Sequence, residues 1–150
     1  MKANRTHLAL VTAMSLLAGN ATAAEHVIEM KNSGPDGAMV FEPGYVEAEK
    51  GDTIRFVPVD PAHNSVSVAV PEGASSWSGG MNEEVTITVD QEGVYVYKCT
   101  PHQALNMAGV ISVGDATNYE AAQNAVKTLT SNAATNKDRL SGYFSNVSAD

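Results

Sequence analysis

Hydrophobic and polar residues alternate along most of the chain between Glu25 and Gly114, a pattern typical of β-strands with one buried face. The runs are rich in β-branched and aromatic residues and are bounded by Gly, Pro, Asn and Asp: His26–Met30, Tyr45–Glu49, Thr53–Val57, Val66–Val70, Val85–Val89, Val94–Cys99 and Gly109–Gly114. Short strands separated by tight turns favour an all-β fold. We therefore expect an antiparallel Greek-key β-sandwich of about eight strands.

From about residue 117 the spacing of apolar residues changes to three or four, which predicts amphipathic helices. Two sets follow this spacing: Tyr119, Ala122, Val126 and Leu129, then Leu140, Tyr143, Phe144 and Val147. Thr135-x-x-Asp138 matches a capping box at the start of the second helix, and Ser131–Asn136 is expected to connect the two helices. Because no linker-like composition separates them from the strands, we expect both helices to pack on the sandwich within one domain.

The first 23 residues have the composition of a secretory signal peptide. A positively charged start is followed by the mostly apolar segment Leu8–Ala18 and by Ala21-Thr22-Ala23, which has the A-x-A pattern of a cleavage site. An uncleaved anchor is the alternative, but the apolar run is shorter than the roughly 20 residues that span a membrane. We expect cleavage after Ala23 or Ala24, so that residues 24–150 form one periplasmic domain without membrane insertion.

The charge balance is acidic, with 17 acidic and 9 basic residues and a net charge of −8. Loss of Lys2 and Arg5 with the leader would lower the net charge to −10. No basic stripe is present to neutralise phosphates, which argues against a nucleic-acid partner. An acidic surface instead speeds the encounter with basic proteins at low ionic strength.

Cys99 is the single cysteine, and a lone thiol in an exported protein is open to oxidation unless something occupies it. It begins the motif Cys99-x2-His102-x4-Met107, between a strand that ends at Cys99 and one that begins near Gly109. His63 lies far upstream, at the start of another predicted strand. Greek-key connections bring such distant loops to one end of a sandwich, so we expect these four side chains to converge on a metal ion.

Two imidazoles, a thiolate and a weak thioether ligand suit copper in both of its oxidation states. A roughly trigonal site of this kind changes little when an electron arrives, and it has no open position for a substrate. The sequence therefore predicts one copper ion that carries single electrons, in a protein that is not an enzyme. A copper enzyme would need a second metal site, for which only His26 remains after the leader is removed.

Copper storage or delivery is the alternative function. Such sites tend to be rich in Met or His and exposed, whereas here Pro101 fixes the thiolate in a short loop. The loop therefore favours a retained redox centre over a site that releases its ion.

At these residues the chain resembles the cupredoxin family of type 1 blue copper proteins, and specifically its pseudoazurin branch. The resemblance covers nearly all of the chain after the leader, including the segments 37–43 and His63-Asn64 and the two C-terminal helices. It implies a cupredoxin-like fold and a type 1 copper ion held by the four residues named above. It also implies that Asn64 links the two ligand loops and that Met39 lies near the ring of His102.

By the same analogy the chain is a monomer that passes electrons through His102 to periplasmic nitrite reductases or cytochromes. It departs from the family at Asn106, where Gly usually precedes the axial Met. Asn tolerates left-handed backbone angles better than most residues, so we expect the loop to close. Of the remaining candidates, Trp77 is expected to pack on the sandwich and His26 to be a surface residue.

Overall fold

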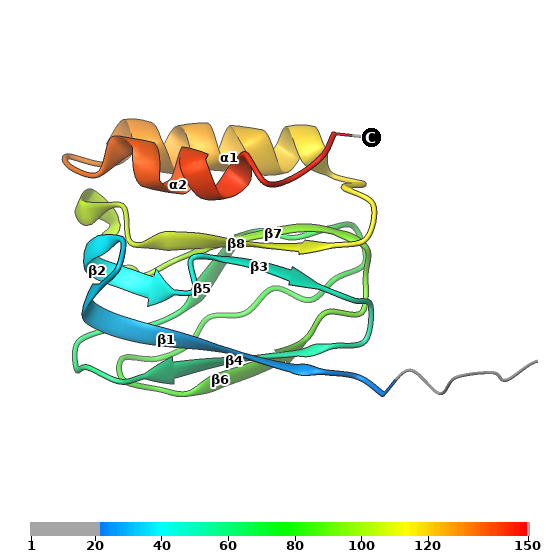
Figure 1. Ribbon diagram of the computed structural model, residues 1–150, viewed down its shortest axis with the longest axis horizontal. Coiled ribbons are helices and arrows are strands. Elements are labelled where there is room, and N and C mark those ends of the chain that lie inside the picture. The colour runs from blue at the N-terminus through cyan, green and yellow to red at the C-terminus, as the bar shows by residue number, and fades with distance from the viewer. Residues whose placement is uncertain (1–21, 150) are drawn as a thin grey trace, which may run out of the picture.

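The computed structural model describes residues 22–149 (Figure 1). Almost all of the expected leader, residues 1–23, lies outside this range. Within it the elements follow one another as β1 (Glu25–Gly34), β2 (Gly37–Glu42), β3 (Tyr45–Ala48), β4 (Thr53–Pro58), β5 (Val66–Ala69), β6 (Val85–Thr88), β7 (Gly93–Lys98), the 3₁₀-helix η1 (Gln103–Leu105), β8 (Ala108–Val113), α1 (Tyr119–Asn132) and α2 (Lys137–Phe144).

The strands form two four-stranded sheets, in the orders β2-β1-β4-β6 and β3-β8-β7-β5. Both sheets are mixed, so the expectation of a purely antiparallel sandwich is wrong. β1 runs parallel to β4, with Ile28 opposite Phe56, and β3 runs parallel to β8, with Tyr45 opposite Val110. Alternation of side chains reports which residues are buried, but it does not report the direction of the neighbouring strand.

The predicted first strand ended at Met30, and β2 was not predicted. In the structure β1 continues to Gly34, and β2 returns antiparallel to it, with Lys31 opposite Val40. Gly37 has a φ of 105°, a conformation that glycine adopts without strain, and it allows the tight connection between the two strands. Pairing across this hairpin satisfies the backbone of residues 31–34, which have low strand propensity by themselves.

Alternate side chains of the two sheets meet in a core that includes an aromatic group. The rings of Phe41 and Phe56 contact Tyr97 edge to face, at centroid distances of 4.8 and 4.9 Å. Trp77 packs against this group, as expected: its ring stacks on Phe56 at 5.6 Å, and its Nε1–H donates to Ser65 Oγ at 3.0 Å. The core thus fixes β7, the strand that leads directly to Cys99.

The two helices cover the outer face of the β3-β8-β7-β5 sheet, as Figure 1 shows. Their apolar faces and the outward residues of β7 and β8 form a second buried cluster: Val94, Val96, Ala108, Val110, Ala122, Val126, Leu129, Leu140, Phe144 and Val147. The helices therefore pack on the sheet through the apolar faces that the sequence pattern predicted. Among the described residues, no helix is both long and apolar enough to cross a membrane.

The helix boundaries differ from those expected. The first helix continues to Asn132, and Asn136 occupies the N-cap of α2 with a left-handed φ of 53° and no side-chain capping bond. The proposed capping box at Thr135 is therefore wrong. Instead, the amide of Asn136 donates to the carbonyl oxygen of Leu105, which holds the start of α2 against the η1 loop.

Candidate metal centre

The four predicted ligands lie in two loops and at the ends of two neighbouring strands. His63 is in the connection between β4 and β5, and Cys99 directly follows β7. His102 precedes η1, and Met107 directly precedes β8. Because β7 and β8 are adjacent and antiparallel, Cys99 and Met107 lie at the same edge of the sheet.

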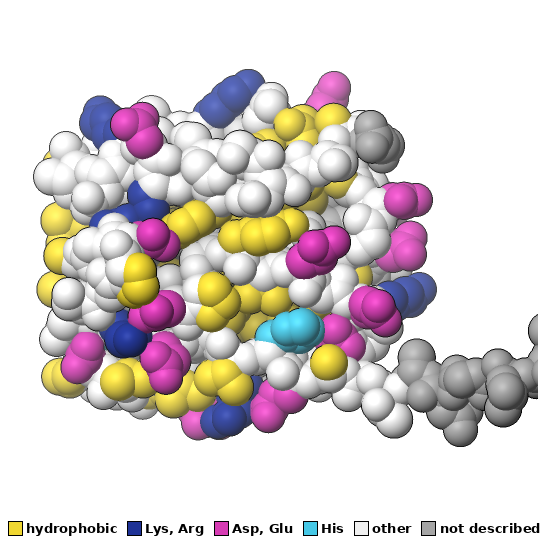
Figure 2. All heavy atoms as spheres, viewed as in Figure 1, with side chains coloured by type: hydrophobic (Ala, Val, Ile, Leu, Met, Phe, Trp, Pro, Cys, Tyr) yellow, Lys and Arg dark blue, Asp and Glu magenta, His cyan; other side chains and the backbone are white. Residues whose placement is uncertain are grey.

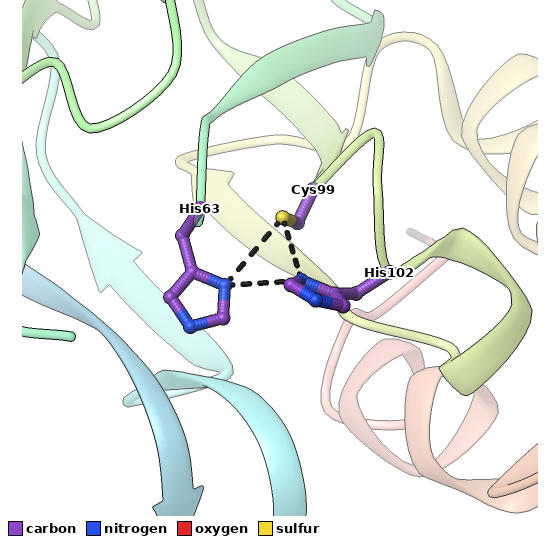
Figure 3. Close-up of side chains that lie close together, drawn as sticks. All are labelled: His63, Cys99 and His102. Carbon is purple, nitrogen blue, oxygen red and sulfur yellow. Dashed lines mark hydrogen bonds between the residues drawn. The ribbon is translucent and has the colours of Figure 1, made fainter. Parts of the chain in front are cut away.

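Three of these side chains point toward one another, as Figure 3 shows. His63 Nδ1 lies 3.1 Å from His102 Nδ1, and Cys99 Sγ lies 3.4 Å from His102 Nδ1 and 3.7 Å from His63 Nδ1. His63 and Cys99 are fully buried, whereas His102 is half-buried. Since bonds from nitrogen and sulfur to a transition metal measure roughly 2.0–2.3 Å, donors this close together can contact a single ion.

A hydrogen bond to Asn32 orients the His63 ring. His63 Nε2 lies 2.9 Å from the Asn32 Oδ1, and because a carbonyl oxygen only accepts, Nε2 carries the hydrogen. In the neutral ring the lone pair is then on Nδ1, which faces Cys99 and His102. The sequence did not indicate this role of Asn32, because the residues that follow it have only the composition of a turn.

The electrostatics of the site favour a neutral imidazole and a protonated thiol in the metal-free protein. Burial lowers the pKa of His63, the His102 ring lowers it further, and Asp60 raises it. Burial raises the pKa of the Cys99 thiol, an effect opposed by hydrogen bonds with the backbone of Asn64 and His102. A cation that binds the sulfur must therefore displace its proton, whereas the His63 nitrogen is ready to bind.

Asn64 links the two ligand loops, as the resemblance implies. Its Oδ1 accepts the Thr100 N–H at 2.8 Å, and its Nδ2 donates to Thr100 Oγ1 at 3.3 Å. The same Nδ2 also donates to the Gly79 carbonyl oxygen at 3.3 Å. One buried amide thus holds the segment after His63 against the segment after Cys99.

Backbone bonds close the loop between Cys99 and Met107. The Cys99 N–H donates to the Met107 carbonyl oxygen at 2.9 Å, and the Met107 N–H donates to that of His102 at 3.2 Å. Asn106 adopts the left-handed conformation expected for it, with φ of 54° and ψ of 40°. Met107 is fully buried in the same core cluster as Cys99, and its role as the fourth ligand stays a prediction.

Comparisons with known proteins point to copper binding. Residues 28–114 match the family model of copper binding proteins of the plastocyanin/azurin family. The pseudoazurin of Paracoccus pantotrophus is 46% identical over 120 residues, which cover 78% of this chain and 83% of that protein. The pseudoazurin of Methylorubrum extorquens is 37% identical over 147 residues, which cover 93% and 96% of the two chains.

Solved structures give the same result. The crystal structure of native pseudoazurin from Hyphomicrobium denitrificans aligns with a TM-score of 0.72 at 38% identity, covering 83% of this chain and 98% of the other. That of pseudoazurin from Methylobacterium extorquens aligns with a TM-score of 0.68 at 34% identity, covering 81% and 98%. The fold and the two C-terminal helices are therefore those of a cupredoxin of the pseudoazurin type.

Proposed function

This chain belongs to the copper-binding plastocyanin/azurin family, and on that premise we propose that it is a periplasmic carrier of single electrons. Its cofactor is copper, and we assign the type 1 ion to His63, Cys99, His102 and Met107. The observation that supports this assignment is the approach of two imidazole nitrogens and one sulfur to within 3.1–3.7 Å of one another. The pseudoazurin relatives are electron carriers, and we propose the same role here in place of an enzymatic one.

The donor set fits copper better than other metals. Imidazole and thiolate bind both Cu(I) and Cu(II), and the thioether of Met107, as the proposed fourth ligand, would complete a site for reversible one-electron transfer. The bound ion supplies the change of oxidation state between Cu(I) and Cu(II). His63 and Cys99 are fully buried, so water has little access to them and a bound copper ion is enclosed. An enclosed ion favours a carrier over a protein that stores or delivers copper.

Residues around the ligands hold them in place through hydrogen bonds. Asn32 fixes the His63 ring, and Asn64 joins the two loops. A site held in this way rearranges little when its charge changes, and small rearrangement favours fast electron transfer. The chain therefore contributes preorganised donors, and the redox chemistry is that of the copper.

His102 is the proposed electron port, because its ring is half-buried while His63 and Cys99 are enclosed. Its two neighbours along the chain, Pro101 and Gln103, are uncharged, and Pro101 is exposed. Such a surface suits a transient contact with another protein. By analogy with the family we propose nitrite reductases or cytochromes as the partners of a monomer.

The first experiment is the visible spectrum of the exported protein with Cu(II), before and after a mild reductant. We expect an intense blue band that bleaches on reduction and returns on reoxidation, and that is absent from Cys99→Ser. His63→Asn should alter or abolish the band, whereas His26→Asn, at a histidine outside the site, should keep it. Weak colour in the unmodified protein would show that the ligands do not form this centre.

A second measurement separates a carrier from a storage protein. Copper should remain bound during incubation with a chelator in both oxidation states, because the site is enclosed. Rapid loss of the ion from the otherwise intact protein would favour storage or delivery.

A further inference from the structure

A buried carboxylate lies at the end of β1 that is distant from the metal centre. Asp52 is 5% exposed. Its Oδ1 accepts the Ala24 N–H at 2.8 Å, and its Oδ2 accepts the Glu49 N–H at 2.9 Å and lies 2.8 Å from His26 Nε2. Figure 2 shows a histidine side chain beside acidic ones near the start of the described chain. His26 lies at the surface as expected, with 28% of its side chain exposed, and its ring is in addition bonded to Asp52.

Ala24 is the residue at which the chain joins the sheet. Its carbonyl oxygen accepts the Thr53 N–H at 2.9 Å, and β1 begins at the next residue, Glu25. Within the described part of the chain, Thr22 and Ala23 precede it, are exposed and belong to no strand. Removal of these two residues therefore leaves the bonds of Ala24 to Asp52 and Thr53 in place, whereas cleavage after Ala24 would remove both bonds.

We propose that removal of the leader between Ala23 and Ala24 places the new terminal ammonium group on the Asp52 carboxylate, where it ties the start of β1 to the β3–β4 turn. Hydrolysis of this peptide bond by a leader peptidase consumes one water. Ala23 leaves with the new carboxylate, and Ala24 keeps the amino group. The nitrogen that already lies 2.8 Å from Asp52 Oδ1 thereby becomes a cation.

The Asp52 carboxylate is suited to this role because it is ionised over the whole physiological range. The Glu49 N–H, His26 and the Ala24 N–H together lower the pKa of Asp52 to about 2. The ionisable side chains around the new terminus are Asp52 and His26, which are bonded to each other, and the Glu25–Arg55 ion pair (2.8 Å) lies on the same strands. A charge-assisted bond to a carboxylate is stronger than the neutral one it replaces.

The ion pair gives folding a pH dependence of known sign. A carboxylate partner raises the pKa of the terminal amine above the roughly 7.7–8.0 of a free chain. The stability from the pair is then fully present below about pH 7.7, and it is lost as the pH rises through the higher folded pKa. His26 faces the same carboxylate and is retained in every form compared below, so it contributes equally to each.

The first test is the mass of the protein exported from the full-length chain. We expect a product that begins at Ala24. A product that begins at Glu25, or one that retains Ala23, would overturn the proposal. This result is independent of copper, so it stands apart from the test of the electron-carrier function.

The second test compares thermal unfolding of two forms prepared with a cleavable tag, one beginning at Ala24 and one beginning at Ala23. The longer form keeps the Ala24 N–H bond to Asp52 but moves the charge by one residue. Between about pH 7 and about pH 9.5 we expect the Ala24 form to lose about 3 °C more in Tm than the longer form. Superimposable pH profiles would overturn the proposal.

Asp52→Asn in both forms should remove the difference between their profiles. Asp52 also accepts the Glu49 N–H, so this variant weakens a second hydrogen bond and could fold poorly for that reason. The pKa of the Ala24 amine, measured by NMR titration of the form that begins at Ala24, tests the ion pair without the Asp52→Asn variant. We expect a pKa above that of a free chain, and an unshifted value would contradict the ion pair.

Discussion

At the scale of single residues, the metal centre depends on side chains that are not themselves ligands. Asn32 and Asn64 use their amide groups differently: the first accepts from a ligand ring, and the second bonds to the backbone of the opposite loop. The orientation of the ligands, and with it the affinity for the ion, therefore depends on these neighbours.

Asn32→Ala should weaken copper binding about tenfold, because the His63 Nε2–H loses its acceptor and the ring becomes free to turn. The measurement is a competition with a chelator of known affinity. Ser33→Ala, at the exposed next residue of β1, is the control and should bind copper like the unmodified protein. Equal affinities of the two variants would contradict the role given to Asn32.

Asn106→Ala should lower the free energy of unfolding by about 1–2 kcal/mol, because the left-handed conformation costs this much for a residue that, unlike Asn, has no polar side chain to offset it. The bond from Asn106 Nδ2 to the Asn136 carbonyl oxygen (2.9 Å) is lost as well. Asn106→Gly loses the same bond but keeps the backbone unstrained, so it should cost less. Denaturant unfolding of the metal-free variants measures both, and equal losses would show that backbone strain is not the cause.

At the scale of elements, α2 is joined to the segments around the metal centre through Arg139. One guanidinium nitrogen of Arg139 donates to the carbonyl oxygen of Met39 at 2.8 Å, and the other to those of Asp36 and Ala38 at 2.9 and 3.0 Å. A longer contact of 3.5 Å reaches the Leu105 carbonyl oxygen in η1. Met39 has a positive φ of 52°, so Arg139 stabilises a strained part of the β1–β2 hairpin.

Arg139→Met should lower the free energy of unfolding by about 2 kcal/mol, since several charge-assisted bonds to carbonyl groups are lost at once. It should also change the relative intensities of the visible bands of the copper form, because η1 follows His102 directly. Arg139→Lys should recover part of both. Lys137→Met, at an exposed position of the same helix, is the control.

An unchanged spectrum with reduced stability would restrict Arg139 to a structural role. Unchanged stability would mean that the other contacts of α2 hold the hairpin without it.

At the scale of the whole molecule, acid resistance should depend on Asp52. Its pKa is about 2 in the folded protein and 3.8 in a free chain, so its contribution is present above about pH 3.8 and is lost as the pH falls toward 2. Asp52→Asn should flatten this part of the profile. Asp90→Asn, at an exposed position, is the control for the loss of one negative charge. The two profiles are compared by unfolding at a series of acidic pH values, and identical slopes would contradict the prediction.

The acidic surface should govern the rate of electron transfer to partners. Acidic side chains are prominent on the face in Figure 2, in line with the net charge of −8. Transfer to a basic cytochrome should therefore slow as salt is added, because screening weakens long-range attraction beyond roughly 10 Å at 0.1 M. Stopped-flow rates at several salt concentrations measure this, and a small uncharged oxidant should show little change. A rate that rises with salt would contradict the prediction.

The sequence by itself determined the features that depend on neighbouring residues. Period-two patterns located seven of the strands, because one buried face leaves its mark on every second residue. The motif Cys99-x2-His102-x4-Met107 was visible because those residues share one loop, and the change of period after residue 117 located both helices. These features are local, and their chemistry could be inferred without coordinates.

The tertiary structure alone decided which distant residues meet. The partners of His63, Arg139 and Asp52 are Asn32, the β1–β2 hairpin and Ala24, at separations of 28 to 103 residues along the chain. The parallel pairing of β1 with β4 and the bond from Asn136 at the start of α2 to Leu105 belong to the same class. Such contacts leave no periodic signal, because each joins a single polar group to one backbone or side-chain atom. Only the packing of the two sheets and the helices brings these two atoms within reach of each other.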